Sequence, residues 1–129
     1  MDKILLIQPD LRTRDELTFL LQHSGFQVVG TAGVEQGLDE LYRGSPDLIL
    51  IAENSHGSDG ANGHPGWLRI REACHAPIII LGRYQDKSTK IELLEMGADG
   101  YFPPPLDYRL LLGDIRAYIR RYKITTGRV

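Results

Sequence analysis

The stretch SPDLILIAENSHGSDG (residues 45–60) decides the fold that this sequence predicts. Its apolar run, DLILIA (47–52), contains four large aliphatic residues in succession, and a short run of this kind is typical of a strand buried on both faces. The residues GSP (44–46) before it and the glycine-rich segment after it break regular structure. Strands buried on both faces lie in parallel sheets, whose sites lie beyond the carboxyl ends of the strands. Here that end is Ala52, and an alanine offers little chemistry.

Strand and helix patterns alternate on both sides of this run. Short apolar or β-branched runs predict four more strands, at 3–7, 26–31, 77–82 and 99–102. Apolar residues at helical spacing predict five helices, from Asp10 to Gly25, at 34–42, at 65–74, at 86–98 and from 107 to 122. This alternation favours an α/β domain built on a single doubly wound, five-stranded parallel sheet.

The size and composition fit one ordinary globular domain. The chain has 129 residues, of which 42% are hydrophobic and 25% charged, and a net charge of -2 argues against a surface that coats nucleic acid. The single cysteine, Cys74, cannot form an internal disulfide, which fits a reducing compartment. No apolar run has the length of a signal peptide or a membrane span, so we expect a cytoplasmic protein without membrane contact.

Metal and phosphate motifs are not recognisable in the sequence. The histidines at 23, 56, 64 and 75 match no zinc-binding spacing, and the glycines of the predicted long loop at 53–66 form no phosphate-binding motif. We therefore expect no metal and no cofactor. We expect one domain over residues 1–122, with 123–129 as a linker or C-terminal tail.

The order of these pieces resembles the receiver domain of bacterial response regulators over about residues 3–122. The matching pieces are KILLIQPD (3–10), SPDLILIA (45–52), SDG (58–60), APIIILG (76–82), MGADGYF (96–102), the proline at 105 and IRAYIRR (115–121). The resemblance implies a flavodoxin-like, CheY-like fold with strand order 2-1-3-4-5 and about five helices. It also implies a cis peptide bond between Pro104 and Pro105.

The resemblance implies a phosphorylation site, from which this sequence departs at each position. Receivers hold Mg²⁺ with an acidic pair after the first strand, and an aspartate ending the third strand accepts the phosphoryl group. A Ser or Thr follows the fourth strand and a lysine the fifth. The corresponding residues here are Gln8, Pro9, Ala52, Gly82 and Pro104. Ala52 has no nucleophilic group, and neither Gln8 nor Pro9 has a carboxylate. We therefore predict a degenerate receiver that is not an enzyme and acts through protein contact.

Three acidic residues leave alternatives open. Glu53 could imitate a phosphoaspartate if the chain turns after Ala52, whereas it points away from the site if the strand continues. Glu53 or Asp59 could also accept a phosphoryl group at a non-standard position. Asp10 could hold Mg²⁺ by itself, although capping the first helix is the simpler role.

The resemblance also suggests a partner surface. In winged-helix regulators of this family the fourth helix, fifth strand and fifth helix form a symmetric dimer face, bound by ion pairs. The residues that correspond to its acids and bases are Glu95, Asp99, Arg116 and Arg121, whereas Asp114 stands where a base is expected. Tyr101 corresponds to the switch aromatic whose rotamer reports activation, and here it is either locked in one state or simply packed.

These features predict a homodimer whose output domain lies outside this chain. The ending IRAYIRRYK (115–123) resembles the run-in to a DNA-binding domain, so DNA would be contacted only through that domain. A sensor kinase or another regulatory protein is a further possible partner. One alternative is a stand-alone signalling adaptor without DNA output. Another is a flavodoxin-like ligand binder, although the sequence contains no motif that indicates one.

Overall fold

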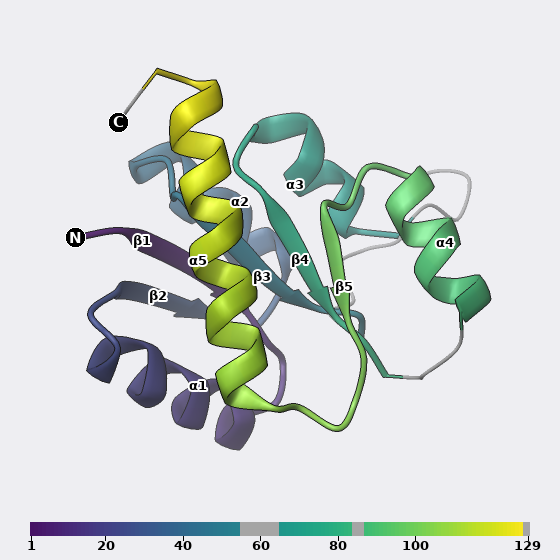
Figure 1. Cartoon of the computed structure of the whole chain (residues 1–129), viewed down its shortest axis with the longest axis horizontal. Helices are drawn as coiled ribbons and strands as arrows, with labels where there is room; N and C mark the ends of the chain where they lie inside the picture. Colours follow the sequence, from purple (N-terminus) through teal and green to yellow (C-terminus); the bar gives the residue numbers. More distant parts are fainter. Residues whose placement is uncertain (55–64, 84–86, 128–129) are drawn as a thin grey trace.

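A computed structural model describes residues 1–54, 65–83 and 87–127 of the chain. Figure 1 shows a twisted sheet with helices on both of its faces. The strands are β1 (Lys3–Ile7), β2 (Gln27–Thr31), β3 (Leu48–Ala52), β4 (Ile78–Leu81) and β5 (Gly100–Phe102). The helices are α1 (Leu11–His23), α2 (Val34–Arg43), α3 (Trp67–Ala73), α4 (Lys87–Glu95) and α5 (Tyr108–Thr125).

The sheet has the predicted architecture. Its strand order is β2-β1-β3-β4-β5, and all neighbouring strands are parallel. The chain runs from β1 to β2 on one side and then crosses to β3 on the other side of β1. This reversal is the topological switch point at which parallel α/β sheets place their sites. The register pairs Ile7 with Ile51 and Ala52 with Leu81, so these strands end at the same edge.

Two separate cores cover the two faces of β3, whose five residues are all buried. Alternate residues point to opposite faces of a strand. Leu48 and Leu50 pack against α1 and α5, whereas Ile49 and Ile51 pack against the layer formed by α2, α3 and α4. Figure 1 shows α5 crossing in front of the sheet.

The last helix is longer than predicted. We expected it to end at residue 122, but α5 continues to Thr125, so the first residues of the predicted tail are helical. No helix breaker interrupts the segment, and the helix ends where the Thr126 N–H returns to the Tyr122 carbonyl and Gly127 takes a positive φ of 71°. The division of the chain into a domain and a tail remains a prediction.

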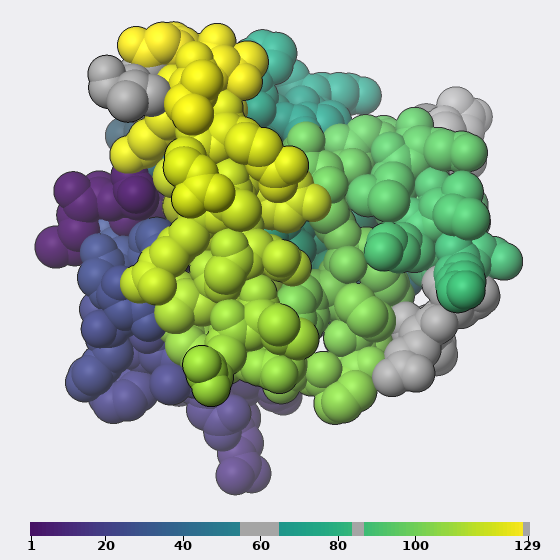
Figure 2. All heavy atoms as spheres, viewed as in Figure 1, coloured from purple at the N-terminus to yellow at the C-terminus, as the bar shows by residue number. Residues whose placement is uncertain are grey.

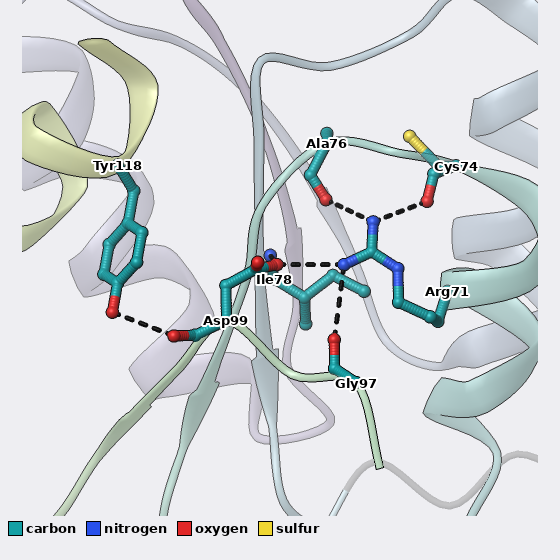
Figure 3. Close-up of polar contacts among 7 residues, drawn as sticks. All are labelled: Arg71, Cys74, Ala76, Ile78, Gly97, Asp99 and Tyr118. Carbon is teal, nitrogen blue, oxygen red and sulfur yellow. Dashed lines mark hydrogen bonds and ion pairs between the residues drawn. The ribbon is translucent and has the colours of Figure 1, made fainter. Parts of the chain in front are cut away.

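Arg71 of α3 holds together the segments that lead into β4 and β5 (Figure 3). Its guanidinium donates to the carbonyl oxygens of Cys74 and Ala76, both at 2.7 Å, and to the Asp99 carboxylate at 2.9 Å. The same carboxylate accepts the N–H of Ile78 at 2.8 Å. One cation therefore satisfies backbone carbonyls that the helices and the sheet leave unpaired.

We expect Arg71→Leu to lower the free energy of unfolding by about 2 kcal/mol, because several charge-assisted hydrogen bonds lose their donor. Urea unfolding measures the change. Arg12→Ala is the matched control, since it removes a cation whose pair with Glu16 is exposed and changes stability by less than about 0.5 kcal/mol. Equal effects of the two substitutions would contradict a structural role for Arg71.

Candidate functional site

The carboxyl ends of β1, β3, β4 and β5 surround a small cavity of about 160 Å³. Its lining residues are Gln8, Thr13, Leu17, Ala52, Asn54, Leu81, Gly82, Arg83, Phe102, Pro103, Pro104 and Leu106. Four of the five predicted degenerate positions therefore meet here, and Pro9 is the one that is not part of the lining. Among the described residues that form this cavity none carries a carboxylate.

Hydrogen bonds occupy the polar groups of Gln8, the residue that follows β1. Gln8 is buried, and its side-chain oxygen accepts the N–H of Asp10 at 3.0 Å. The Gln8 carbonyl accepts a hydrogen bond from the Arg14 guanidinium at 2.8 Å. In place of an acidic pair, this position has a neutral amide and a nearby cation, a combination unsuited to Mg²⁺, which prefers carboxylate and water oxygens.

Asp10 is the N-cap of α1, as predicted. Its carboxylate accepts hydrogen bonds from the Thr13 hydroxyl at 2.5 Å and from the Thr13 N–H at 2.9 Å. These bonds, with smaller contributions from Arg12 and Arg14, lower the pKa of Asp10 from its ordinary value of 3.8. The carboxylate therefore caps the first turn of α1 and points toward Thr13.

At the end of β3, Ala52 and Glu53 have different surroundings. Ala52 and Asn54 line the cavity, whereas Glu53, the residue between them, does not. Instead, the Glu53 N–H donates to the Leu81 carbonyl at 2.9 Å, and its carboxylate accepts the N–H of Arg83 at 2.7 Å. This geometry gives Glu53 a role in joining the ends of β3 and β4.

Tyr101 of β5 occupies the space next to Gly82. Its side chain is 7% exposed and belongs to the core beneath α2, α3 and α4. A Cβ atom built on Gly82 would lie 2.2 Å from both Cζ and the hydroxyl oxygen of Tyr101. The ring thus fills the volume that a side chain at position 82 would need. The Pro104–Pro105 peptide bond that follows β5 is cis, which confirms the prediction.

A groove lies between α4 and α5 above β5, on the face that Figure 2 shows. One hollow of about 280 Å³ is lined by Ile79, Lys90, Leu94, Asp99, Gly100, Tyr101, Asp114 and Tyr118. An adjacent hollow of about 310 Å³ includes Asp99 and Arg121, so the structure brings these two predicted dimer residues together. Sequence reasoning missed Lys90, although its place on the helix four residues before Leu94 would have been a signal.

Arg116 does not line either of these hollows, and its part in a dimer face stays a prediction. Its guanidinium approaches the Ser24 carbonyl at 3.4 Å and lines a cavity on the opposite side of α5, near Phe26. A helix turns by about 100° per residue, so Arg116 points roughly 200° away from Asp114. Glu95 is exposed at the end of α4 and lines neither hollow.

Some predicted residues have no part in these sites. Asp59, His56 and His64 lie outside the described residues. His23 stacks on Phe19 with ring centroids 4.3 Å apart, and within residues 1–54, 65–83 and 87–127 no cluster of His, Cys, Asp and Glu suits a metal ion. Over the same residues, no helix has the length and apolar character needed to cross a membrane.

Comparison with known sequences gives a consistent family. Residues 4–116 match the sequence model of the response regulator receiver domain. Transcriptional regulatory protein AfsQ1 of Streptomyces coelicolor is 36% identical over 121 residues, and CpxR of Escherichia coli is 35% identical over 121 residues. Each alignment covers 94% of this chain but only 52% and 50% of the relative. The chain thus spans about half the length of these relatives.

Comparison with solved structures gives the same fold. A two-component response regulator from Clostridium difficile superposes with a TM-score of 0.81 at 22% identity, covering 94% of this chain and 98% of the other. The BeF3-activated N-terminal receiver domain of RstA from Klebsiella pneumoniae also gives 0.81, at 24% identity, covering 92% and 99%. At these identities the similarity establishes the fold alone.

The pKa of Asp10 predicts a pH-dependent contribution to stability. The pKa of Asp10 is lower in the folded state than in the unfolded state, so the ionised carboxylate stabilises the fold at pH values above the unfolded pKa of 3.8. This stabilisation is lost as the pH falls through the lowered pKa of the folded state. Asp10→Asn keeps a capping oxygen but cannot ionise. We expect the wild-type Tm to exceed that of Asp10→Asn near neutral pH.

Thermal unfolding at a series of pH values tests this expectation. The Tm difference between the two proteins should shrink as the pH is lowered below 3.8. Asp15→Asn, a change in an exposed carboxylate on the same helix, is the control for the general effect of removing a negative charge. A difference that is constant over this range would refute the ionic cap.

Proposed function

The chain belongs to the response regulator receiver domain family, and on this basis we propose that it regulates through protein contact without being phosphorylated. The observation that carries the proposal is the buried methyl group of Ala52 at the end of β3, where the family has its phosphoryl acceptor. The Gln8 amide and the Arg14 cation beside it support the same conclusion, since neither provides the carboxylate that binds Mg²⁺ best. The chain is then a signalling module without catalytic activity of its own.

The output of this module is a second part of the proposal. Relatives such as AfsQ1 and CpxR are transcriptional regulatory proteins about twice as long as the matched segment. We propose that this receiver controls a DNA-binding output domain in the cytoplasm and touches DNA only through it. A stand-alone adaptor that docks on a sensor kinase or another regulatory protein is the alternative, and the exposed groove between α4 and α5 would serve either role.

We propose that the groove between α4 and α5 is a two-fold dimer face. Lys90 on α4 and Asp114 on α5 are exposed on its two sides, and neither has an ion-pair partner within the described part of the chain. In a two-fold interface, residue i meets j and j meets i. Lys90 of each protomer would therefore pair with Asp114 of the other, which gives two equivalent ion pairs.

Exposed apolar side chains support the same face. Leu110 is 64% exposed and lies one helical turn before Asp114, so it shares that side of α5. Ile91 is 56% exposed and lies three residues before Leu94, which lines the groove. Isolated apolar residues on a surface are ordinary, but two that flank complementary charges offer the dry contact area that an interface needs.

Intact mass measurement tests the absence of phosphorylation. We expect incubation of the chain with acetyl phosphate and Mg²⁺ to leave its mass unchanged, because position 52 has no nucleophile. Ala52→Asp restores the nucleophile alone and should also stay unmodified, since Gln8 and Pro9 remain unable to hold Mg²⁺. A phosphoryl group on the wild-type chain, mapped to Glu53 or Asp59, would instead support the non-standard acceptor.

Sedimentation velocity over a concentration series tests the dimer. We expect Lys90→Glu to weaken dimerisation by about tenfold or more, roughly 1.4 kcal/mol, because a like-charge contact replaces each ion pair. Combining Lys90→Glu with Asp114→Lys should restore the affinity. Arg116→Glu is the matched control, as it makes the same change of charge on the other side of α5. A monomer at every concentration, or a dimer broken only by Arg116→Glu, would contradict the proposed face.

A further inference from the structure

A further cavity lies beside α5 at the edge of the sheet where β1 and β2 begin. Its volume of about 530 Å³ is larger than that of each hollow described above. Figure 2 shows the N-terminal segment, in purple, beside the C-terminal part of α5, in yellow, and both contribute to this cavity. The described lining residues are Asp2, Ser24, Gly25, Phe26, Arg116, Ile119, Arg120, Lys123 and Ile124. None of them lines the strand-end cavity or the groove between α4 and α5.

The inner wall of this cavity is apolar. Phe26 and Ile119 line it although they are only 7% and 4% exposed, so they form its deepest part. Both belong to the core between the sheet, α1 and α5, which holds them in place. Ile124 is 61% exposed and stands at the mouth. A ligand that covers these side chains with its own carbon atoms gains the free energy of apolar burial.

The rim of the cavity is cationic. Arg116, Arg120 and Lys123 follow one another at helical spacing and form one stripe along α5. Lys123 pairs with Asp2, the one carboxylate among the described lining residues. Within the described part of the chain, neither Arg116 nor Arg120 forms an ion pair, and the contact of Arg116 with the Ser24 carbonyl is long, at 3.4 Å. The cavity is thus locally positive in a chain whose net charge is -2.

The size of the cavity favours a small molecule over a protein partner. A protein interface uses about 20–30 residues of each partner, whereas nine of the described residues line this cavity. Sites for small ligands have volumes of about 300–1,000 Å³ and apolar walls with a few polar groups. Arginine binds carboxylates and phosphates through paired N–H donors. A ligand that matches both the wall and the rim therefore carries an anionic head group and a hydrocarbon part.

We propose that this cavity binds a small amphipathic oxyanion, in which a carboxylate or phosphate head group is joined to an aliphatic chain. Arg116 and Arg120 donate hydrogen bonds to the head group, and the chain lies against Phe26, Ile119 and Ile124. The site goes beyond the proposed function, because it needs neither the degenerate positions at the strand ends nor the face between α4 and α5.

Isothermal titration calorimetry with decanoate and with decyl phosphate, each below its micelle-forming concentration, tests the site. We expect one or both to bind about tenfold or more tightly than acetate and inorganic phosphate, which lack the chain, and than decyltrimethylammonium, which has the opposite charge. Arg116→Gln/Arg120→Gln should weaken binding by about tenfold or more, because the head group loses its donors. Arg109→Gln is the matched control, since it removes an exposed cation of α5 that does not line the cavity.

A second variant separates the apolar wall from the rim. Ile124→Ser keeps the three cations and should weaken the binding of either amphiphile by about threefold or more. Absence of binding by both amphiphiles, equal binding of decyltrimethylammonium, or equal losses in Arg109→Gln and the paired variant would overturn the proposal. Lys90→Glu should bind as the wild-type chain does, and no readout involves acetyl phosphate. A failure of this site is therefore distinguishable from a failure of the proposed function.

Discussion

The burial of β3 on both faces is the constraint on which the rest of the structure depends. All five residues from Leu48 to Ala52 are buried, and the strand is hydrogen-bonded to β1 and β4 on its two edges. A strand of this kind cannot face water, so helices must cover both sides of the sheet, and parallel pairing requires crossover connections. The crossing in turn places the ends of β1, β3 and β4 side by side, and the cavity lies at these ends.

The receiver fold is present although Ala52 stands where the resemblance places the phosphoryl acceptor. Packing fixes the position of the cavity, whereas side chains at a few strand ends decide its reactivity. A buried carboxylate needs partners to offset the cost of desolvation, and Ala52 has no such requirement. Gln8 satisfies its side-chain oxygen with the N–H of Asp10, and Glu53 satisfies its carboxylate with the N–H of Arg83. These two polar side chains thus join neighbouring segments of the chain.

Charged residues on the α4–β5–α5 side are of two kinds, those bound within the chain and those that are exposed at the groove. Asp99 is committed to Arg71 and to the N–H of Ile78, which ties the starts of β4 and β5 together. Lys90 and Asp114 have no such contacts in the described residues and stand on the two sides of the groove. A carboxylate already bound within its own chain gains less from a partner than one that is free to pair.

The sequence by itself determined the five strands and their parallel arrangement, because each strand carries its own burial pattern. It also predicts the loss of the acceptor, since the identity of Ala52 needs no structure to be read. It also determined the N-cap at Asp10, since capping is a local contact. It could not show that Arg116 lies beside Ser24 and Phe26, because these neighbours of α5 are distant in sequence. Only the tertiary structure brought Gly82 against Tyr101: Gly82 follows β4 and Tyr101 lies in β5, and the register of β4 on β5 places the two side by side.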